Sequence, residues 1–380
     1  MFSRKSVRPI LFLILGATII TEIVALSPSS LEEESIPQPK QIDPATLIPK
    51  NQEPTLAPGI PIDRVADYNV ENFRYVSVQN KVKQWKIVAD KANLYHDIDL
   101  VHARRVKVQI YDTDDQITEV TGSEAKYFLG KRDLEMYGNV KTVFPDGFVL
   151  HSEYMRYKPN ESQIYIPTKH YVQGDNKAAT KSDKSNPTDA DDESPSTQSQ
   201  SPSTSSEGRF EFTSYGLNYN MKKGLINLLK TAHVIFYNGS EVTIIDSDKC
   251  HINRNTKIAH FTMYPNRPIK KRFVYISQET LFTKARWAVL NYASLNKDVV
   301  QYLTAYDDVF IKELGNHKSL RYATSGKAEF NQPLNLIVLT QLPQVYQDAD
   351  TVTGDIILLH RDTDVVEVEH SNAYTEGDGT

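Results

Sequence analysis

The chain has 380 residues and a formal net charge of −5. This length suits two average domains or one long repetitive one, and the charge gives no general case for nucleic-acid binding. Cys250 is the single cysteine, which excludes a disulfide framework and a cysteine-based metal cluster. The 21 tyrosines against 2 tryptophans, with plentiful Val, Ile and Thr, are typical of a β-rich protein.

The first 26 residues predict a membrane anchor. Arg4, Lys5 and Arg8 precede an apolar run over residues 9–26. A basic start before a short apolar run is typical of a secretory signal or a signal anchor, and 18 residues are near the lower limit for spanning a bilayer. No convincing small-x-small cleavage site is present, so we expect an uncleaved transmembrane helix, with a cleaved signal or a buried helix as alternatives. The positive-inside rule then places the rest of the chain outside the cytoplasm.

Two polar segments divide the remainder. Residues 27–61 contain eight prolines, a composition that favours extended polyproline II and predicts a semi-rigid stalk. Residues 174–208 are rich in Ser and Asp and contain no aromatic residue and no aliphatic one larger than Ala. This second segment predicts a disordered insert in a surface loop. The segments bound two predicted modules, residues 62–173 and 209–376.

Both modules contain repeated β-hairpins. Residues 134–150 (LEMYGNVKTVFPDGFVL) alternate apolar and polar positions and then contain the turn signal PDG, as expected for a half-buried hairpin. A short motif of a small or apolar residue, any residue, and a large apolar residue recurs at Ala92/Leu94, Ala125/Tyr127, Met155/Tyr157, Leu217/Tyr219, Cys250/Ile252, Leu290/Tyr292, Ala328/Phe330 and Ile356/Leu358. In most copies we expect a second strand of the hairpin downstream, centred at Val106, Val140, Tyr171, Val234, Val309, Val345 and Ala373. For the Cys250 copy it is expected near residues 261–263. Stacked hairpins bury an apolar face that one hairpin cannot bury alone.

The sequence predicts no enzyme, cofactor or metal site. The G-x-S-x-G, H-E-x-x-H, P-loop and G-x-G-x-x-G motifs are missing. Acidic pairs and triples lie at expected turns without an EF-hand pattern, and they are interpreted as solvated turns; these are Asp112/Asp114/Asp115, Asp246/Asp248 and Asp362/Asp364. The basic run at residues 267–272 (RPIKKR) is interpreted as a solvated loop, with phosphate binding as the alternative. Cys250 is expected to face the core.

Three stretches carry a family resemblance. Residues 85–97 (WKIVADKANLYHD), 106–127 (VKVQIYDTDDQITEVTGSEAKY) and 134–157 (LEMYGNVKTVFPDGFVLHSEYMRY) resemble the LptC family, the membrane-anchored periplasmic components of the lipopolysaccharide transport bridge. Residues 323–370 are similar to the LptA or OstA-like family, the soluble component of that bridge. The long stalk and the Ser-rich insert depart from the usual LptC pattern. The chain is therefore interpreted as an LptC-like module followed by an LptA-like module, or as an enlarged LptC-type protein.

The resemblance implies an all-β protein, an antiparallel β-jellyroll open like a clam, whose apolar interior holds lipid acyl chains. The implied partners are lipopolysaccharide or a related glycolipid, an inner-membrane ABC transporter, and another β-jellyroll bridge protein joined by edge-strand pairing, near residues 68–78 and 364–374. The implied location is the periplasmic side of the inner membrane. A structural or adhesive cell-envelope β-protein without lipid is the alternative. Alternation independently predicts two inward faces. The first comprises Val106, Val108, Ile110, Ala125, Tyr127, Leu134, Met136, Val140, Met155 and Tyr157, and the second Phe330, Leu336, Val338, Val345, Ile356, Leu358, Val366 and Val368.

Overall fold

The computed structural model describes residues 66–79, 81–111, 116–176, 209–238, 241–292, 300–315, 320–347, 350–370 and 372–375. The predicted anchor, the stalk and residues 177–208 of the predicted insert lie outside these ranges. Within the described ranges, no helix is long and apolar enough to cross a membrane. The helices there are single 3-10 turns: η1 (His96–Ile98), η2 (Pro159–Glu161), η3 (Ile269–Lys271) and η4 (Gln332–Leu334).

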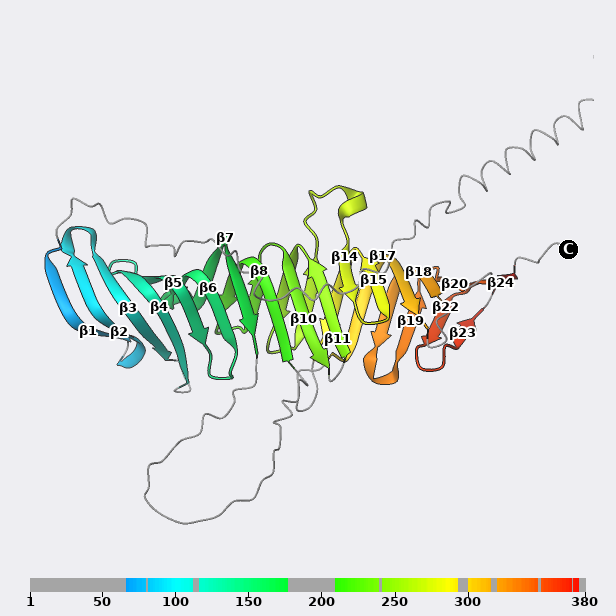
Figure 1. Cartoon of the computed structure of the whole chain (residues 1–380), viewed down its shortest axis with the longest axis horizontal. Helices are drawn as coiled ribbons and strands as arrows, with labels where there is room; N and C mark the ends of the chain where they lie inside the picture. The colour runs from blue at the N-terminus through cyan, green and yellow to red at the C-terminus, as the bar shows by residue number, and fades with distance from the viewer. Residues whose placement is uncertain are drawn as a thin grey trace, which may run out of the picture. The chain divides into compact units, whose positions relative to one another are not determined.

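The first eight strands form an antiparallel sheet in chain order, each hydrogen-bonded to the next (Figure 1). They are β1 (Tyr68–Gln79), β2 (Val82–Tyr95), β3 (Leu100–Tyr111), β4 (Ile117–Phe128), β5 (Asp133–Val143), β6 (Val149–Lys158), β7 (Gln163–Asp175) and β8 (Arg209–Asn220). All eight have ten or more residues, which is long for strands of globular proteins.

Beyond β8 the sheet divides into two ladders. One runs through β9 (Leu225–Leu228), β12 (Lys249–Asn253), β13 (Ile258–Thr262) and β16 (Trp287–Asn291). The other runs through β10 (Ala232–Asn238), β11 (Glu241–Ser247), β14 (Val274–Ser277) and β15 (Leu281–Ala285). Both ladders pair with the long strand β17 (Tyr302–Leu314), which pairs with β18 (Leu320–Asn331).

The sheet divides again after β18. One ladder continues through β19 (Leu336–Thr340), β22 (Ile356–His360) and β23 (Val366–Glu369). The other continues through β20 (Gln344–Gln347), β21 (Asp350–Thr353) and β24 (Asn372–Thr375). Among the described strands, β1, β23 and β24 each pair with one neighbour only. These three strands are therefore the edges of the sheet at its two ends.

Each long strand belongs to two layers, which we call arm 1 and arm 2. Arm 1 contains β9, β12, β13, β16, β19, β22 and β23, and arm 2 contains β10, β11, β14, β15, β20, β21 and β24. Strands β1–β8, β17 and β18 contribute one half to each arm. We call the line where the arms meet the crease, and the strand ends away from it the lips.

The crease is built from bulges and left-handed backbone. Pairing registers shift at the crossing points of the long strands, for example between Tyr137 and Val140 and between Tyr306 and Val309. Residues there with positive φ are Asn72, Arg105, Gly138, Asn139, Gly216, Asp307 and Asp308. A bulge bends its strand and increases the local twist, so one strand can turn from one layer into the other. At Gly216 (φ 81°) a Cβ would lie 2.8 Å from the Thr168 Cα, so only glycine fits.

The hydrophobic core lies between the two arms as one continuous cluster. Aromatic side chains of the two arms touch directly: the rings of Trp85 in arm 2 and Tyr127 in arm 1 are 4.7 Å apart in a T-shaped contact. Phe144 of the arm 2 lip contacts Tyr219 of arm 1 in the same way, at 5.2 Å. Such edge contacts stabilise a pair beyond the area it buries.

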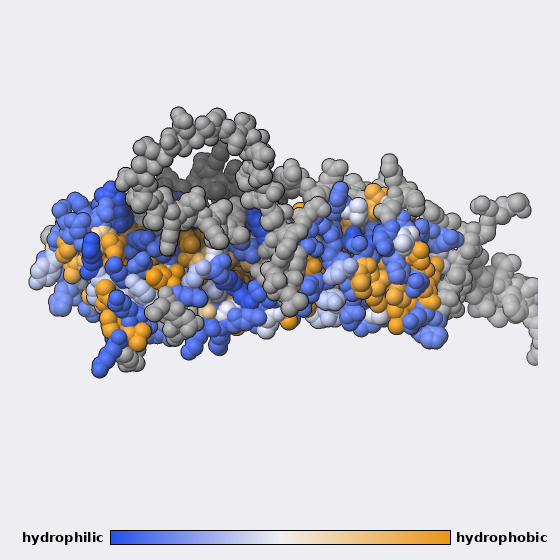
Figure 2. Space-filling view, turned by 90° about the horizontal axis from the view of Figure 1, so that it is seen from below, coloured by the Kyte–Doolittle hydropathy of each residue, from blue (hydrophilic) through white to orange (hydrophobic). Residues whose placement is uncertain are grey.

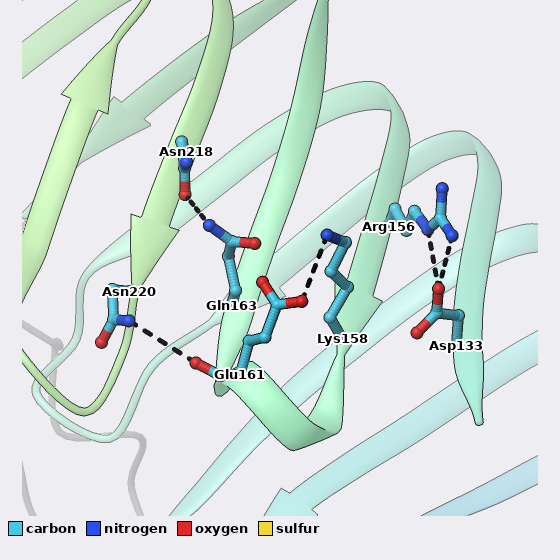
Figure 3. Close-up of polar contacts among 7 residues, drawn as sticks. All are labelled: Asp133, Arg156, Lys158, Glu161, Gln163, Asn218 and Asn220. Atoms are coloured by element: carbon cyan, nitrogen blue, oxygen red, sulfur yellow. Dashed lines mark hydrogen bonds and ion pairs between the residues drawn. The ribbon is translucent and has the colours of Figure 1, made fainter. Parts of the chain in front are cut away.

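The two predicted modules share this sheet and core. Strand β7 continues to Asp175 and pairs with β8 on either side of the crease. Figure 3 shows the outer side of this junction, where the Gln163 side-chain amide donates to the Asn218 side chain at 2.6 Å. The interior therefore runs past residues 177–208 without interruption of the hydrogen-bonded ladder.

The repeat predicted from the sequence matches the arms, with two corrections. Every motif copy begins on a strand of arm 1, and every predicted second-strand centre lies in arm 2. The two are not partners in one hairpin, because a return strand of arm 1 lies between them. For the Cys250 copy, residues 261–263 belong to this return strand or follow it, and the arm 2 strand is β14, reached through the projecting loop that carries η3 (Figure 1).

Candidate functional site

The interior between the arms is the candidate functional site. The ten residues predicted for its first face are all buried, none more than 5% exposed. They alternate with half-buried or exposed neighbours such as Glu135 and Lys141, whose strand positions face outward. Their burial places these side chains inside; their contact with lipid stays a prediction.

The prediction for the second face is partly wrong. Phe330 and Val345 are buried, and Val366 and Val368 pack half-buried against the core. The other four predicted residues face outward instead: Leu336, Val338, Ile356 and Leu358. Their neighbours take the inward positions, with less than 2% exposure for Ile337, Leu339, Ile357 and Leu359.

The error at β19 and β22 has a physical reason. Both strands are apolar on both faces, so alternation does not distinguish the two registers. The register of β19 against β18 is set by the turn of η4, which ends with Asn335 in the left-handed conformation (φ 46°). In this register Ile337 lies opposite Phe330. On the outer face Val338 lies opposite Leu358. Figure 2 shows apolar patches among polar residues on the side seen from below, including one toward the C-terminal end of the sheet.

Aromatic residues in the middle of the interior were missed. Phe148 and Phe212 are fully buried, and Phe210 is 3% exposed. The three rings lie within 6.5 Å of one another, centroid to centroid. The signal was present in residues 210–212 (FEF), which alternate as the first face does.

We call the cluster of Phe148, Phe210 and Phe212 the aromatic floor. One polar contact joins the lips next to this cluster, and we call it the middle clasp. Arg254, in the arm 1 turn between β12 and β13, pairs with Asp146, in the arm 2 turn between β5 and β6. The Arg254 guanidinium also donates to the Tyr219 hydroxyl at 3.0 Å and lies 4.8 Å from the Phe148 ring centroid. Its side chain is 17% exposed and that of Asp146 is 52% exposed, so the clasp lies where the apolar interior meets water.

A second contact joins the lips near the C-terminal end; we call it the buried clasp. Glu313 and Arg321 of arm 2 pair at 2.5 Å, and their side chains are 4% and 3% exposed. Arg361, which follows β22 of arm 1, donates through Nε to the other Glu313 oxygen at 2.9 Å. Its Nη1 is 3.7 Å from Glu241. Because one carboxylate serves two guanidinium groups from opposite arms, this contact fixes the distance between the lips.

Some of the other polar candidates have structural partners, and Asp112, Asp114 and Asp115 lie outside the described residues. Asp248 is 2% exposed and is held by Arg267 at 2.5 Å and by the Tyr264 backbone N–H at 2.8 Å. Asp246 pairs with His233 at 2.6 Å. Burial raises the pKa of the Cys250 thiol well above its usual value. In the part of the chain that the structure describes, no group of His, Cys, Asp and Glu is arranged to hold a metal ion.

A family of known proteins matches the first part of the sheet. Residues 46–182 match the model of the family described as LptC, lipopolysaccharide-assembly, LptC-related. The resemblance to this family is confirmed over that range. The match ends before β8, so the similarity of residues 323–370 to the LptA or OstA-like family rests on the sequence resemblance described above.

One solved structure shows a weaker likeness. It is the crystal structure of LptH, the LptA homologous periplasmic component of the lipopolysaccharide transport device from Pseudomonas aeruginosa. It shares 11% identity at a TM-score of 0.31, over 36% of this chain and 95% of that one, which supports no inference about function. A search of curated proteins found no match.

Proposed function

We propose that the chain is a membrane-anchored bridge component that holds lipopolysaccharide, or a related glycolipid, by its acyl chains between the two arms. The observation that carries this proposal is the continuous apolar interior of a sheet whose first part matches an LptC-related family. Each acyl CH₂ removed from water gains about 0.8 kcal/mol. A lipid with several chains therefore needs such an interior to cross an aqueous compartment.

The repeated hairpins would allow a lipid to move along the interior as well as to bind there. Arm 1 and arm 2 present similar apolar rows from Trp85 to Leu359, so a lipid meets many comparable positions. Comparable positions give no single deep minimum in which the lipid would stay. We propose that residues 1–26 anchor the chain in the inner membrane, that an ABC transporter there supplies the lipid, and that transfer proceeds toward the outer membrane.

Edge strands provide the route to partners. β1 at one end, and β23 and β24 at the other, have one described neighbour each, and an unpaired edge accepts a strand from another chain. We propose that a second β-jellyroll joins at such an edge and continues the interior.

One observation favours the alternative, a structural cell-envelope protein without lipid. The interior is filled by the protein's own side chains, as in a closed sandwich. In the proposed function these side chains separate to admit the lipid, whereas in the alternative they never do.

Site-specific photo-crosslinking in living cells separates the two. Two pairs of neighbours are matched for place and differ in direction: Met136 (inward) with Glu135 (outward) on β5, and Leu339 (inward) with Val338 (outward) on β19. We expect a photo-reactive residue at Met136 or Leu339 to capture glycolipid, and one at Glu135 or Val338 to capture none. Capture at none of the four positions, or equally at all four, would overturn the proposal.

A further inference from the structure

Cations gather on the arm 1 lip beside the middle clasp. Two turns carry them: Lys222 and Lys223 lie in the turn between β8 and β9, and Arg254 and Lys257 lie in the turn between β12 and β13. The turns adjoin, because the Arg254 backbone N–H donates to the Gly224 carbonyl at 2.9 Å and the Asn255 side-chain amide donates to the Lys223 carbonyl at 3.1 Å. We call these four residues the cationic lip.

Among the described residues, Asp146 and Glu161 are carboxylates that adjoin the cationic lip. Asp146 reaches the cationic lip from arm 2 through Arg254. Glu161, on the neighbouring arm 1 turn, is held by Lys158 at 3.4 Å (Figure 3). Its backbone carbonyl, rather than its carboxylate, accepts from Asn220. Both lysines before Gly224 are exposed. The lip therefore has an excess of positive charge directly above an apolar interior.

Arg254 lies at the boundary between the two environments. Below it are the Phe148 ring at 4.8 Å and the Tyr219 ring at 6.0 Å. Beside it is the carboxylate of Asp146, which is half exposed. An amphiphile whose chains lie among the interior rings would place its head group at this height. A guanidinium presents a planar set of N–H donors that matches the oxygens of a carboxylate or a phosphate equally well.

We propose that the cationic lip binds the anionic group, a phosphate or carboxylate, of an amphiphile whose acyl chains occupy the interior, and that this group replaces Asp146 on Arg254. This inference rests on the proposed function and adds to it a head-group site and a reason for the middle clasp. In the absence of lipid, the Asp146 carboxylate holds the lips together through Arg254. On binding, Asp146 is released into water, where a half-exposed carboxylate loses little, and the lips separate at that point.

The exchange is favoured by the neighbouring lysines. Asp146 brings one negative charge on a short side chain attached to arm 2, whereas a head-group phosphate reaches Lys222, Lys223 and Lys257 as well. Because Lys222 and Lys223 are exposed, each adds a modest attraction that salt screens. The specificity therefore comes from Arg254, and the lysines raise the affinity for anionic over neutral head groups.

The test compares two ligands that differ only in charge: lipid A with its phosphates, and the same lipid A after enzymatic dephosphorylation. Binding to the purified full chain is measured by displacement of a neutral fluorescent acyl probe. We expect Arg254→Gln to weaken binding of phosphorylated lipid A about tenfold, as loss of one charge-assisted hydrogen bond does, and to change binding of the dephosphorylated form less than about twofold. Asp146→Asn should tighten binding of the phosphorylated form only.

Matched controls separate position from charge. Arg105→Gln removes another guanidinium that pairs with a half-exposed Asp, Asp90 at 2.6 Å, at the crease, and should change neither affinity. Arg254→Lys keeps the charge but loses the planar donors, and should fall between wild type and Arg254→Gln. Inorganic phosphate should not compete at millimolar concentration if the site takes a head group held in place by its chains; full competition would assign the site to free phosphate.

The outcomes are distinguishable. Equal weakening of both lipids by Arg254→Gln, or no effect on either, would overturn the head-group site while leaving the apolar interior as the binding site. If wild type binds neither form of lipid A, the proposed function fails and this inference fails with it. Melting temperatures of the variants near that of wild type establish that the affinities refer to folded protein.

Discussion

The middle clasp and the buried clasp join the same two arms by the same kind of bond, yet their surroundings differ. Asp146 is half exposed, and Arg254 lies at the edge of the aromatic floor. Glu313 and Arg321 are removed from water almost completely, and Arg361 joins them from the other arm. An exposed ion pair contributes little and is easily exchanged, whereas breaking a buried one leaves an uncompensated charge.

This difference assigns different roles to the two places. The lips at the buried clasp stay together because no part of it can leave for water without a large cost. At the middle clasp, the ion pair between Asp146 and Arg254 adds a small contribution to the larger one from the aromatic rings below it. The interior is therefore expected to open first near Asp146 and last near Glu313.

Breaking the buried clasp gives the largest expected effect. Glu313→Gln leaves the Arg321 and Arg361 guanidinium groups buried without their shared carboxylate, and we expect the free energy of unfolding to fall by about 3–5 kcal/mol. Arg321→Gln should cost less, since Glu313 keeps Arg361. Urea titration of both variants measures this. If both substitutions cost under about 1 kcal/mol, as exposed pairs do, the buried clasp does not hold the lips together.

Overpacking the interior below the middle clasp comes next. The Gly174 Cα faces Phe212, and a Cβ there would lie 2.4 Å from that ring and 3.0 Å from Leu150. Gly174→Ala must therefore displace an aromatic ring in a tightly packed region, at a cost of about 1–3 kcal/mol. Urea titration against wild type checks this, with Gly130→Ala as control, where the nearest atom would be 3.7 Å away. An unchanged stability would show that the aromatic floor is loosely packed.

Much of the fold followed from the period-two pattern. The motif copies identified arm 1 strands and their downstream centres identified arm 2 strands, because each arm buries one face and alternation reports that face. The crease could not be predicted in this way. Its register shifts at Tyr137 and Tyr306 depend on left-handed residues such as Gly138, Asn139 and Asp308. Gly, Asn and Asp also favour ordinary turns, so they do not mark a crossing between arms.

The interior was predictable only where one face of a strand is apolar. Leu134 and Met136 alternate with Glu135 and were placed correctly inside. Val338 and Leu358 were not, because Leu339 and Leu359 beside them are equally apolar. The turn of η4 sets the register of β19, and β22 pairs with β19. Neither clasp was predictable. Asp146 and Arg254 are 108 positions apart, and their meeting depends on the closure of the two arms.

Breaking the middle clasp should have a smaller effect than either change above. Asp146→Asn removes an exposed pair, and we expect a loss of no more than about 1 kcal/mol in the free energy of unfolding. The Tyr219 bond and the Phe148 contact of Arg254 remain. Hydrogen exchange of the β5–β6 turn should increase, while exchange near Glu313 stays as in wild type. Faster exchange at both places would show that the two clasps act as one unit.

A change in salt concentration should have the smallest effect on the free energy of unfolding. It compares the middle clasp with the buried clasp most directly. The screening length of water falls from about 10 Å at 0.1 M salt to about 3 Å at 1 M, which weakens exposed pairs much more than buried ones. The difference in the free energy of unfolding between wild type and Asp146→Asn is expected to be no more than about 1 kcal/mol. It should therefore shrink toward zero at 1 M sodium chloride. The difference between wild type and Glu313→Gln should change little, because its charges are shielded from the salt by the protein itself. Measuring both differences in urea at the two salt concentrations decides the matter, and Arg105→Gln supplies the reference for an exposed pair far from the lips. A middle clasp that resists salt as the buried clasp does would mean that Arg254 is held too firmly to be exchanged, and the lips would then have to open elsewhere.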